Sequence, residues 1–264
     1  MNPRTSEQLA HKESITDNLS VLEDASMLLG DSAHRATIAE DDYGSKWVVK
    51  SHNVSYGKAM NEVRMLEVFS REGIPTLPIK NMPIQVEKHN DNSEEATLIM
   101  PYVEDLQPLT RLDWREYTAT PRYENLLKPE IVASISLAGK MHRRGYVHGD
   151  FQLKNIGYLR SGKIITYDLE NAHKLEGDQS VRIQDRAADI VSLLKSLRLN
   201  GLFEKSSMGV IKDEVDELLI TYVEKAKDDE AFEVADIAEQ KLMNWVSDPN
   251  QINRALSRFV ITAA

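Results

Sequence analysis

The spacing of hydrophobic residues divides the chain into a strand-rich front third and a helix-rich remainder. Short runs rich in β-branched residues and bounded by turn residues predict strands at 46–50, 84–87 and 97–100. Among them, an apolar stripe with a helical period predicts a helix at 57–71, which Gly73 and Pro75 end. Beyond residue 104 the same period predicts helices at 129–144, 184–199, 208–226, 229–246 and 250–262.

This order of elements predicts an α+β fold with two lobes. We expect a small antiparallel-sheet lobe with one helix over 21–103, and a larger, mainly helical lobe with extra C-terminal helices over 104–264. The lobes are expected to meet at a hinge near residues 101–104. Residues 1–20 alternate polar and charged side chains without an apolar core, so we expect a polar N-terminal extension there.

Composition narrows the class of protein. The chain is 41% hydrophobic and 28% charged, which is ordinary for a globular protein and excludes a collagen-like or wholly disordered chain. Its formal charge of -10 repels polyanions, so we expect no nucleic-acid partner. Because there is no cysteine, any metal must use oxygen or imidazole ligands. No apolar run is long enough to span a membrane, and we expect a cytoplasmic protein without a membrane partner.

One acidic residue falls on the apolar stripe of the helix predicted at 57–71. Glu62 lies at helical spacing from Ala59 and Leu66, where an unpaired carboxylate is costly. Lys50 ends the strand just before this helix and is the partner that we expect. The alternative is that Glu62 lies at the edge of the stripe and pairs with Lys58 of its own helix.

A second group of polar residues lies in the run 146–168. Ser161–Gly162 predicts a two-residue hairpin turn, in a register that places Asn155 opposite Asp168. An amide oxygen and a carboxylate on neighbouring strands suit Mg²⁺, which takes one or two protein oxygens together with water and phosphate oxygens. Asp150 lies on the loop that enters the hairpin, where it is placed to accept a proton from an acceptor hydroxyl.

Taken in chain order, these residues resemble the protein-kinase-like superfamily. The matching positions are Lys50, Glu62, the strand into residues 101–103, the motif His148-Gly149-Asp150-x-x-x-x-Asn155, and Asp168-Leu169-Glu170. The resemblance implies a phosphotransferase that uses ATP and Mg²⁺. It implies catalytic roles for Asp150, Lys50 and Glu62, and metal binding by Asn155 and Asp168.

The resemblance also implies a nucleotide site between the lobes. Met100 is expected to gate the back of the adenine pocket. Pro101 is expected to offer its carbonyl and Val103 its N–H, so the missing N–H of proline is not needed. The phosphate-covering loop is expected to include Gly30 and Ser32, with fewer glycines than the superfamily usually has.

Two features of the chain point to different branches of the superfamily. The HGD and Asp-x-Glu motifs resemble aminoglycoside phosphotransferases and choline kinases, which favours a small-molecule acceptor with a hydroxyl. The short stretch between hinge and catalytic loop resembles the RIO and Bud-type kinases, so an atypical Ser/Thr protein kinase or an ATPase is the alternative. A pseudokinase that binds nucleotide and regulates a partner is the alternative of another class.

Two residues are predicted to support the catalytic loop, and one short connection bears on regulation. His148 is expected to brace the catalytic loop rather than to act as an acid or base. Asp189, in the helix predicted at 184–199, resembles the buried aspartate that supports this loop in the superfamily. Between Asp168 and that helix there is no room for a long activation segment, so control by its phosphorylation is not expected.

Overall fold

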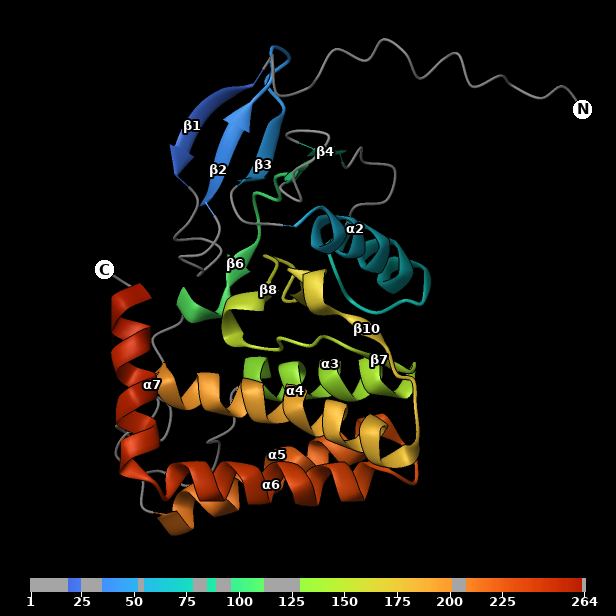
Figure 1. The fold of residues 1–264 in the computed structure, drawn as a ribbon, viewed down its shortest axis with the longest axis vertical. Helices are drawn as coiled ribbons and strands as arrows, with labels where there is room; N and C mark the ends of the chain where they lie inside the picture. The colour runs from blue at the N-terminus through green and yellow to red at the C-terminus, as the bar shows by residue number, and fades with distance from the viewer. Residues whose placement is uncertain are drawn as a thin grey trace, which may run out of the picture.

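The computed structural model describes residues 19–24, 35–51, 55–77, 85–88, 96–111, 129–200 and 208–262. Within these ranges the chain has the α+β fold that the sequence predicts. Figure 1 shows the first strands gathered at one end, helix α2 beneath them, and all but the last of the remaining helices stacked at the other end. The boundaries at 21–103 and 104–264 stay a prediction, and residues 1–18 of the expected N-terminal extension lie outside the described ranges.

An antiparallel sheet forms the first layer. Its strands are β1 (Ser20–Asp24), β2 (Arg35–Glu40), β3 (Lys46–Ser51), β4 (Gln85–Lys88) and β5 (Ala96–Pro101), in the spatial order β1-β2-β3-β5-β4. β3 pairs with β5 in a register that places Lys50 opposite Leu98 and Trp47 opposite Pro101. The three predicted strands are therefore confirmed, and the sheet aligns the end of β3 with the strand that leads into the hinge.

Helix α2 (Tyr56–Arg71) begins and ends where its sequence predicts. Ser55 caps it by accepting a hydrogen bond from the Lys58 N–H at 3.3 Å. The buried face of α2 contains apolar side chains and one carboxylate: Ala59, Glu62, Met65, Leu66 and Phe69. Burial of this stripe fixes the rotation of the helix, and with it the direction in which Glu62 points.

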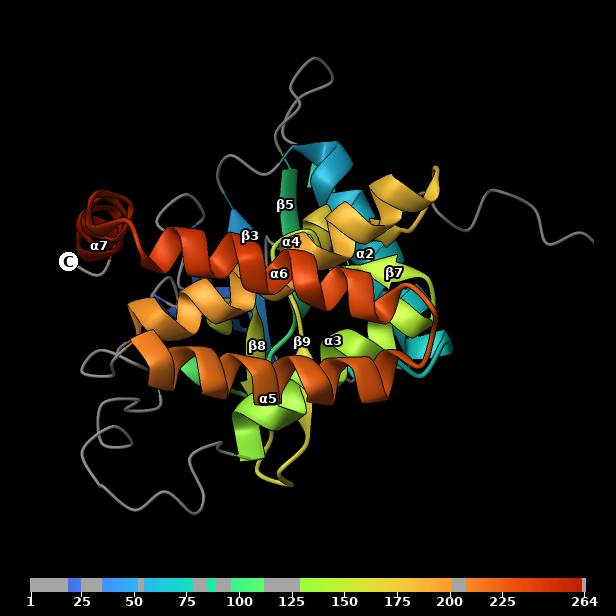
Figure 2. The same ribbon diagram turned by 90° about the horizontal axis from the view of Figure 1, so that it is seen from below.

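The helical layer consists of α3 (Pro129–Arg143), α4 (Gln179–Leu199), α5 (Met208–Ala226) and α6 (Ala231–Val246), seen from below in Figure 2. α3 packs on α5, and α4 packs on α6. The close approach of α3 and α5 requires Gly139, because a Cβ there would lie 2.8 Å from the Cβ of Lys225. The predicted helices are confirmed, except that α4 begins five residues earlier, where Asp178 accepts a hydrogen bond from the Val181 N–H at 3.0 Å.

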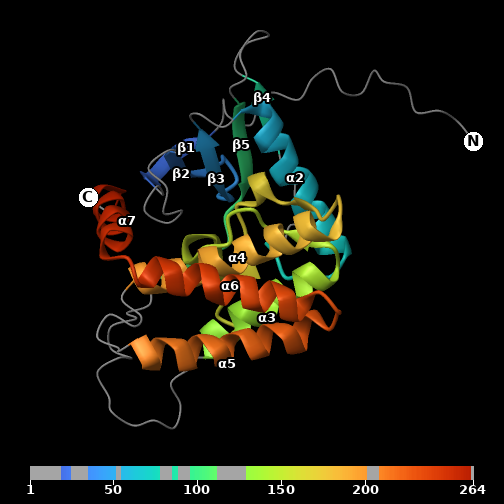
Figure 3. The same cartoon turned by 60° about the horizontal axis from the view of Figure 1, so that its bottom comes forward.

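Helix α7 (Pro249–Thr262) follows α6 and leaves the stack. Figures 1 and 3 show it running along one side of the molecule toward β1 and β2. Among the described residues, none of the helices combines the length and the apolar character that a membrane span needs.

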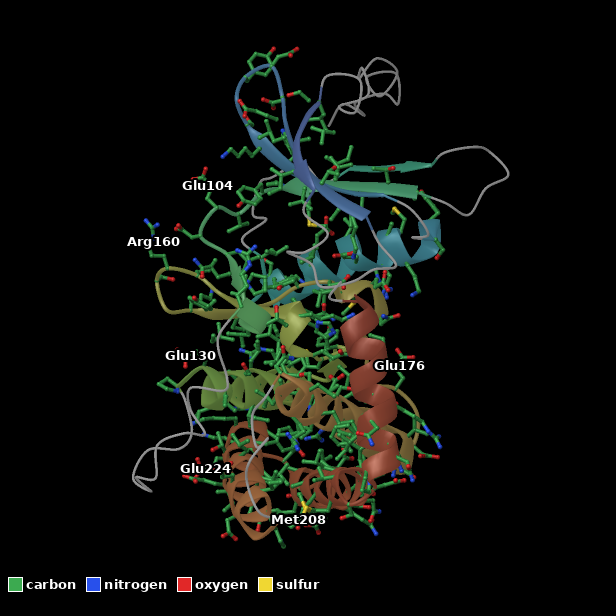
Figure 4. The ribbon with its side chains drawn as sticks, turned by 90° about the vertical axis from the view of Figure 1, so that its left-hand side faces the viewer. Glu104, Glu130, Arg160, Glu176, Met208 and Glu224 are labelled. Atoms are coloured by element: carbon green, nitrogen blue, oxygen red, sulfur yellow. The ribbon has the colours of Figure 1, made fainter. Side chains whose placement is uncertain are left out.

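Short elements between the two layers carry the catalytic motifs. They are β6 (Gln107–Pro108), η2 (Leu109–Arg111), β7 (Tyr146–Val147), η4 (Leu153–Asn155), β8 (Ile156–Tyr158), β9 (Ile164–Thr166), η5 (Leu169–Asn171) and β10 (His173–Lys174). β6 pairs with β8, and β8 with β9, so the segment after the hinge is joined to the β8–β9 hairpin. Glu104 and Arg160 lie on the same side of the molecule in Figure 4, and Arg160 Nε is 3.7 Å from Asp105 Oδ1.

The register predicted for this hairpin is wrong by one residue. Ile156 pairs with Thr166, and the Tyr167 N–H donates to the Asn155 carbonyl at 3.0 Å, so Asn155 lies opposite Tyr167 rather than Asp168. The turn has three residues because Leu159 and Lys163 close it and Gly162 adopts φ 78°. Asp168 is consequently one position past the strand pair, in the segment that turns into η5.

Candidate active site

A cavity that is partly open to solvent lies between the sheet, helix α2 and the short elements that follow the hinge and β9. Its polar wall is formed by Lys50, Glu62 and Asp168, and Met100 and Val103 belong to its largely apolar remainder. Residues predicted from separate parts of the sequence therefore line one cavity.

Lys50, Glu62 and Asp168 form a buried ion cluster at the inner end of this cavity. The Lys50 ammonium is 3.1 Å from Glu62 Oε2 and also contacts Asp168 Oδ1. Lys50 comes from β3, Glu62 from α2, and Asp168 from the segment after β9. The predicted partnership of Lys50 with Glu62 is present, whereas Lys58, the alternative partner, contacts Glu170 Oε1 at 3.0 Å.

The charges of this cluster stabilise one another against the cost of burial. Burial raises the pKa of Glu62 to about 7, and the adjacent Lys50 ammonium opposes part of that rise. For Lys50, burial acts to lower the pKa, but the carboxylates of Glu62 and Asp168 outweigh it and raise the pKa above its ordinary value. Lys50 similarly overcomes the effect of burial on Asp168 and lowers the pKa of that carboxyl. Lys50 is therefore a fixed cation at neutral pH.

Asp150 lies at the entrance of the β8–β9 hairpin, and three neighbours fix its carboxylate. Gln152 Nε2 donates to Oδ1, and Asn155 Nδ2 donates to Oδ2 at 2.9 Å and to the Asp150 carbonyl at 2.8 Å. Lys154 Nζ lies 3.5 Å from Oδ2. About a quarter of the Asp150 side chain, 26%, remains exposed, so the oriented carboxylate is accessible to an acceptor.

The residues predicted to hold Mg²⁺ suit that ion. Both Asn155 Nδ2 contacts are to oxygen acceptors, which fixes the orientation of the amide. Its Oδ1 is then buried, with no hydrogen-bond partner in the part of the chain that the structure describes. A buried acceptor without a donor is costly, and a hard cation satisfies it.

Asp168, the other residue predicted to hold Mg²⁺, has a strained backbone position. It adopts φ 59° and ψ 56°, in the left-handed region, which directs its side chain away from the path of β9. Backbone strain of this kind persists where the surrounding structure holds it, often at functional sites. Among the described residues no group of three His, Asp or Glu side chains could hold a metal ion, so Asn155 and Asp168 would rely on water and phosphate oxygens for the remaining ligands.

A buried hydrogen-bond network supports the backbone of this loop from behind. Asp189 on α4 accepts from the His148 N–H at 2.7 Å and the Gly149 N–H at 2.9 Å. His142 Nε2 lies 3.2 Å from the same carboxylate. His148 Nε2 donates to the Tyr167 carbonyl at 3.0 Å and its Nδ1 accepts from the Asp150 N–H at 3.3 Å, so the ring is a brace, as its sequence position predicts.

Gly149 lets the catalytic loop approach the segment after Asp168. It adopts φ 77°, and a Cβ at this position would lie 2.5 Å from the Asn171 carbonyl oxygen. A larger residue therefore cannot occupy this position without moving the backbone of one segment or the other. Glycine at this position of the HGD motif is thus explained by contact between the catalytic loop and η5.

The hinge residues lie at the end of β5 and border the cavity. Met100 is buried at the end of β5, Pro101 ends that strand, and both line the cavity. The Tyr102 N–H donates to the Lys46 carbonyl, and the Val103 carbonyl accepts from the Leu106 N–H, so neither bond uses the Val103 N–H. Lys50, Glu62 and Asp168 line the same cavity as this hinge. Asn155, which bonds to Asp150, accepts at its carbonyl from the N–H of the residue before Asp168. Gly30 and Ser32 lie outside the described residues.

Two polar residues at the site have contacts that the sequence analysis did not foresee. Gln152 orients the Asp150 carboxylate, and Asn61 bonds to the segment after Asp168. Gln152 stands two residues after Asp150 in the motif, so its position was a usable signal. Asn61 precedes Glu62, but its partners are more than 100 residues away in the chain and no local pattern indicates them.

Comparison with known proteins places most of these residues in one matched region. The model of the lipopolysaccharide kinase (Kdo/WaaP) family matches residues 42–222, more than half of the chain. A comparison with curated proteins found no match. The matched region begins before β3 and ends in α5, so it includes Lys50, Glu62, the hinge, the catalytic loop and Asp168.

Proposed function

This chain belongs to the lipopolysaccharide kinase (Kdo/WaaP) family, within the protein-kinase-like superfamily, and we propose that it transfers the γ-phosphate of ATP, with Mg²⁺, to a hydroxyl of a saccharide acceptor. Membership of the family makes it a kinase, a phosphotransferase with a hydroxyl acceptor. The observation that carries the finer proposal is the Lys50 cluster at the cavity, together with the Asp150 carboxylate that Asn155 orients. Asn155 is bonded to the residue before Asp168 and has a buried oxygen without a partner among the described residues.

Each of these residues has a distinct part in the proposed reaction. Lys50, held by Glu62, binds phosphate oxygens of the nucleotide, and its raised pKa keeps it charged as it does so. Asp150 orients the acceptor hydroxyl and takes its proton as the oxygen attacks. Met100, Pro101 and Val103 hold the adenine, with the Val103 N–H as donor.

Asn155 and Asp168 would hold Mg²⁺, which supplies neutralisation of the phosphate charge when bound. The support for this pair is the buried Oδ1 of Asn155 and the fixed position of the Asp168 carboxylate. Since phosphoryl transfer asks for little covalent chemistry from the protein, the chain contributes mainly by positioning and by placed charges.

The acceptor class follows from the family and from the preference that the sequence motifs express. The family description names lipopolysaccharide, whose phosphorylated groups are sugar hydroxyls, and the HGD and Asp-x-Glu motifs independently favour a small-molecule acceptor. We therefore place the acceptor hydroxyl on a saccharide rather than on a Ser or Thr side chain of a protein.

A transfer assay tests the proposal. γ-Labelled ATP and Mg²⁺ are incubated with the full chain and with lipopolysaccharide, its core saccharides, simple amino alcohols or unrelated proteins. We expect label in the saccharides and a loss of roughly 10²–10⁴-fold in kcat for Asp150→Asn, which keeps the shape of the side chain and loses the base. Label in proteins alone would replace the saccharide acceptor by a protein. If ATP and Mg²⁺ bind but wild type and Asp150→Asn show equal residual turnover, the chain is a nucleotide-binding pseudokinase.

A further inference from the structure

The connection from Asp168 to helix α4 is short. After Asp168 the chain passes through η5 and β10 and reaches α4 at Gln179, with no long activation segment between them. Nevertheless α2 must keep Glu62 against Lys50, and Asp168 must stay beside both. Some other contact has to fix α2 relative to the Asp168 segment.

Asn61 of α2 makes that contact. Its Nδ2 donates to the Glu170 carbonyl and to the Ala172 carbonyl, each at 2.9 Å. Its Oδ1 accepts from Arg64 Nη2 at 3.0 Å, so all three contacts agree with one orientation of the amide. Both donors of a single side chain thus bridge two carbonyls of η5 and the residue after it.

The bridged segment lies between α2 and the catalytic loop. On one side Glu170 and Ala172 accept from Asn61, and on the other the Asn171 carbonyl packs against Gly149. Because Asn61 and Glu62 are consecutive in α2, they point in directions about 100° apart. Glu62 therefore reaches Lys50, while Asn61 reaches the segment that carries Asp168.

We propose that Asn61 is a positioning residue that locks α2 to the Asp168 segment and thereby sets Lys50, Glu62 and Asp168 in their working arrangement. This inference rests on the proposed function, since it concerns the same site. The lock takes the place that an ordered activation segment has in kinases that are switched by phosphorylation. With this contact in place, the arrangement of Lys50, Glu62 and Asp168 does not depend on phosphorylation.

Asn61→Asp tests the lock, because it keeps the shape of the side chain, removes both donors and sets a carboxylate against two carbonyls. Asn250→Asp is the matched control: it makes the same chemical change at an exposed position in the first turn of α7.

We expect Asn61→Asp to lower kcat roughly tenfold, and the Mg²⁺ concentration for half-maximal rate to rise by about threefold or more, with Asn250→Asp near wild type. A merely structural role lowers the folded fraction and leaves the Mg²⁺ dependence unchanged, and that result would overturn the proposal. Thermal unfolding of each variant gives the folded fraction. Asn61→Ala, which adds no charge, is expected to show the same shift to a smaller extent.

Hydrogen exchange of the backbone at 169–173 provides a readout that does not need turnover. We expect exchange in this segment to accelerate about tenfold in Asn61→Asp and to be unchanged in Asn250→Asp. If hydrogen exchange at 169–173 and the kinetics are both unchanged in Asn61→Asp, the proposed role of Asn61 is wrong and the proposed function still stands. A wild-type chain without phosphate transfer would overturn the proposed function instead, and the exchange experiment would still decide whether Asn61 fixes the segment.

Discussion

Two buried clusters in this molecule place one cation against two carboxylates, and their surroundings differ. The Lys50 cluster consists of Lys50, Glu62 and Asp168 and lines the cavity between the sheet and the helices. The Arg186 cluster consists of Arg186 on α4 with Asp228 and Glu230 in the turn between α5 and α6. Both cations are almost completely buried, with 4% and 3% of their side chains exposed.

The hydrogen bonds of Arg186 are complete. Its Nε donates to Tyr222 Oη at 3.0 Å, and its two terminal nitrogens donate to Asp228 and Glu230 at 2.9 to 3.2 Å. Every nitrogen of the guanidinium has a protein acceptor, and the carboxylates are themselves partly exposed to water. Arg186 therefore joins α4, α5 and the turn before α6, and its planar guanidinium has no N–H left to donate to a ligand.

The Lys50 cluster is arranged the other way. Its carboxylates are more deeply buried than those of Asp228 and Glu230, and Lys50 borders a cavity that is partly open to solvent. Asn155 has a buried oxygen without a donor among the described residues. In the proposed function this incomplete pairing serves to accept anionic phosphate oxygens and a cation. Burial of charge alone therefore does not distinguish the proposed functional site. What distinguishes it is a buried polar atom that lacks a partner among the described residues, close to a charged cluster that lines a cavity.

Replacing Lys50 should produce the largest effect of the predictions from this comparison. In Lys50→Met the cation at the cavity is lost, and we expect kcat/KM to fall by at least about 100-fold, as for other placed charges in enzymes. Glu62 limits the cost to the fold because it takes up a proton, its pKa being raised already. Lys46→Met is the control on the same strand, since Lys46 is exposed and pairs with Glu104. Transfer assays together with thermal unfolding check the outcome; global unfolding of Lys50→Met would make Lys50 mainly a structural partner.

Replacing Arg186 should reduce the stability of the fold and leave catalysis almost unchanged, the opposite of what is expected for Lys50. Losing the charged hydrogen bonds that join three elements is expected to lower the free energy of unfolding by about 3 kcal/mol, with kcat per folded molecule within about threefold of wild type. Arg182→Met serves as control, because Arg182 lies one turn earlier on α4, pairs with the same Glu230 and is about one-third exposed. Denaturant unfolding and active-site titration measure the two quantities. A large loss of kcat in folded Arg186→Met would extend the functional site to α4 and break the comparison.

The sequence was sufficient to predict the main elements and the residues of the Lys50 cluster, but not every detail of their arrangement. Helical period and turn residues were sufficient for β3, β5 and the six described helices. The order of Lys50, Glu62, Asp150, Asn155 and Asp168 in the chain predicted the site that the proposed function uses. The hairpin register was not predictable from Ser161 and Gly162 alone. One left-handed glycine serves both a two-residue turn and the three-residue turn that forms here.

The remaining misses have a common physical cause, which is dependence on distant backbone. Asn61 donates to carbonyls at Glu170 and Ala172, and any residue offers a carbonyl, so sequence carries no sign of the partners. Whether every N–H of the Arg186 guanidinium finds an acceptor likewise depends on Tyr222 and on a turn some 40 residues away. Which buried charges are complete is therefore a property of the assembled fold.

The pH dependence of stability distinguishes the two clusters by a smaller effect. Burial raises the pKa of Glu62 to about 7 from an ordinary value of 4.5, so between these values the folded chain holds a proton that the unfolded chain has released. A state that binds more protons is destabilised as pH rises, and the free energy of unfolding should therefore decline between about pH 4.5 and 7 on account of Glu62.

Denaturant unfolding at several pH values, compared between wild type and Glu62→Gln, isolates this contribution. We expect the free energy of unfolding of Glu62→Gln to rise relative to that of wild type as pH increases through this range. A difference that is flat from pH 4.5 to 7 would mean that Lys50 compensates Glu62 as fully as Asp228 and Glu230 compensate Arg186.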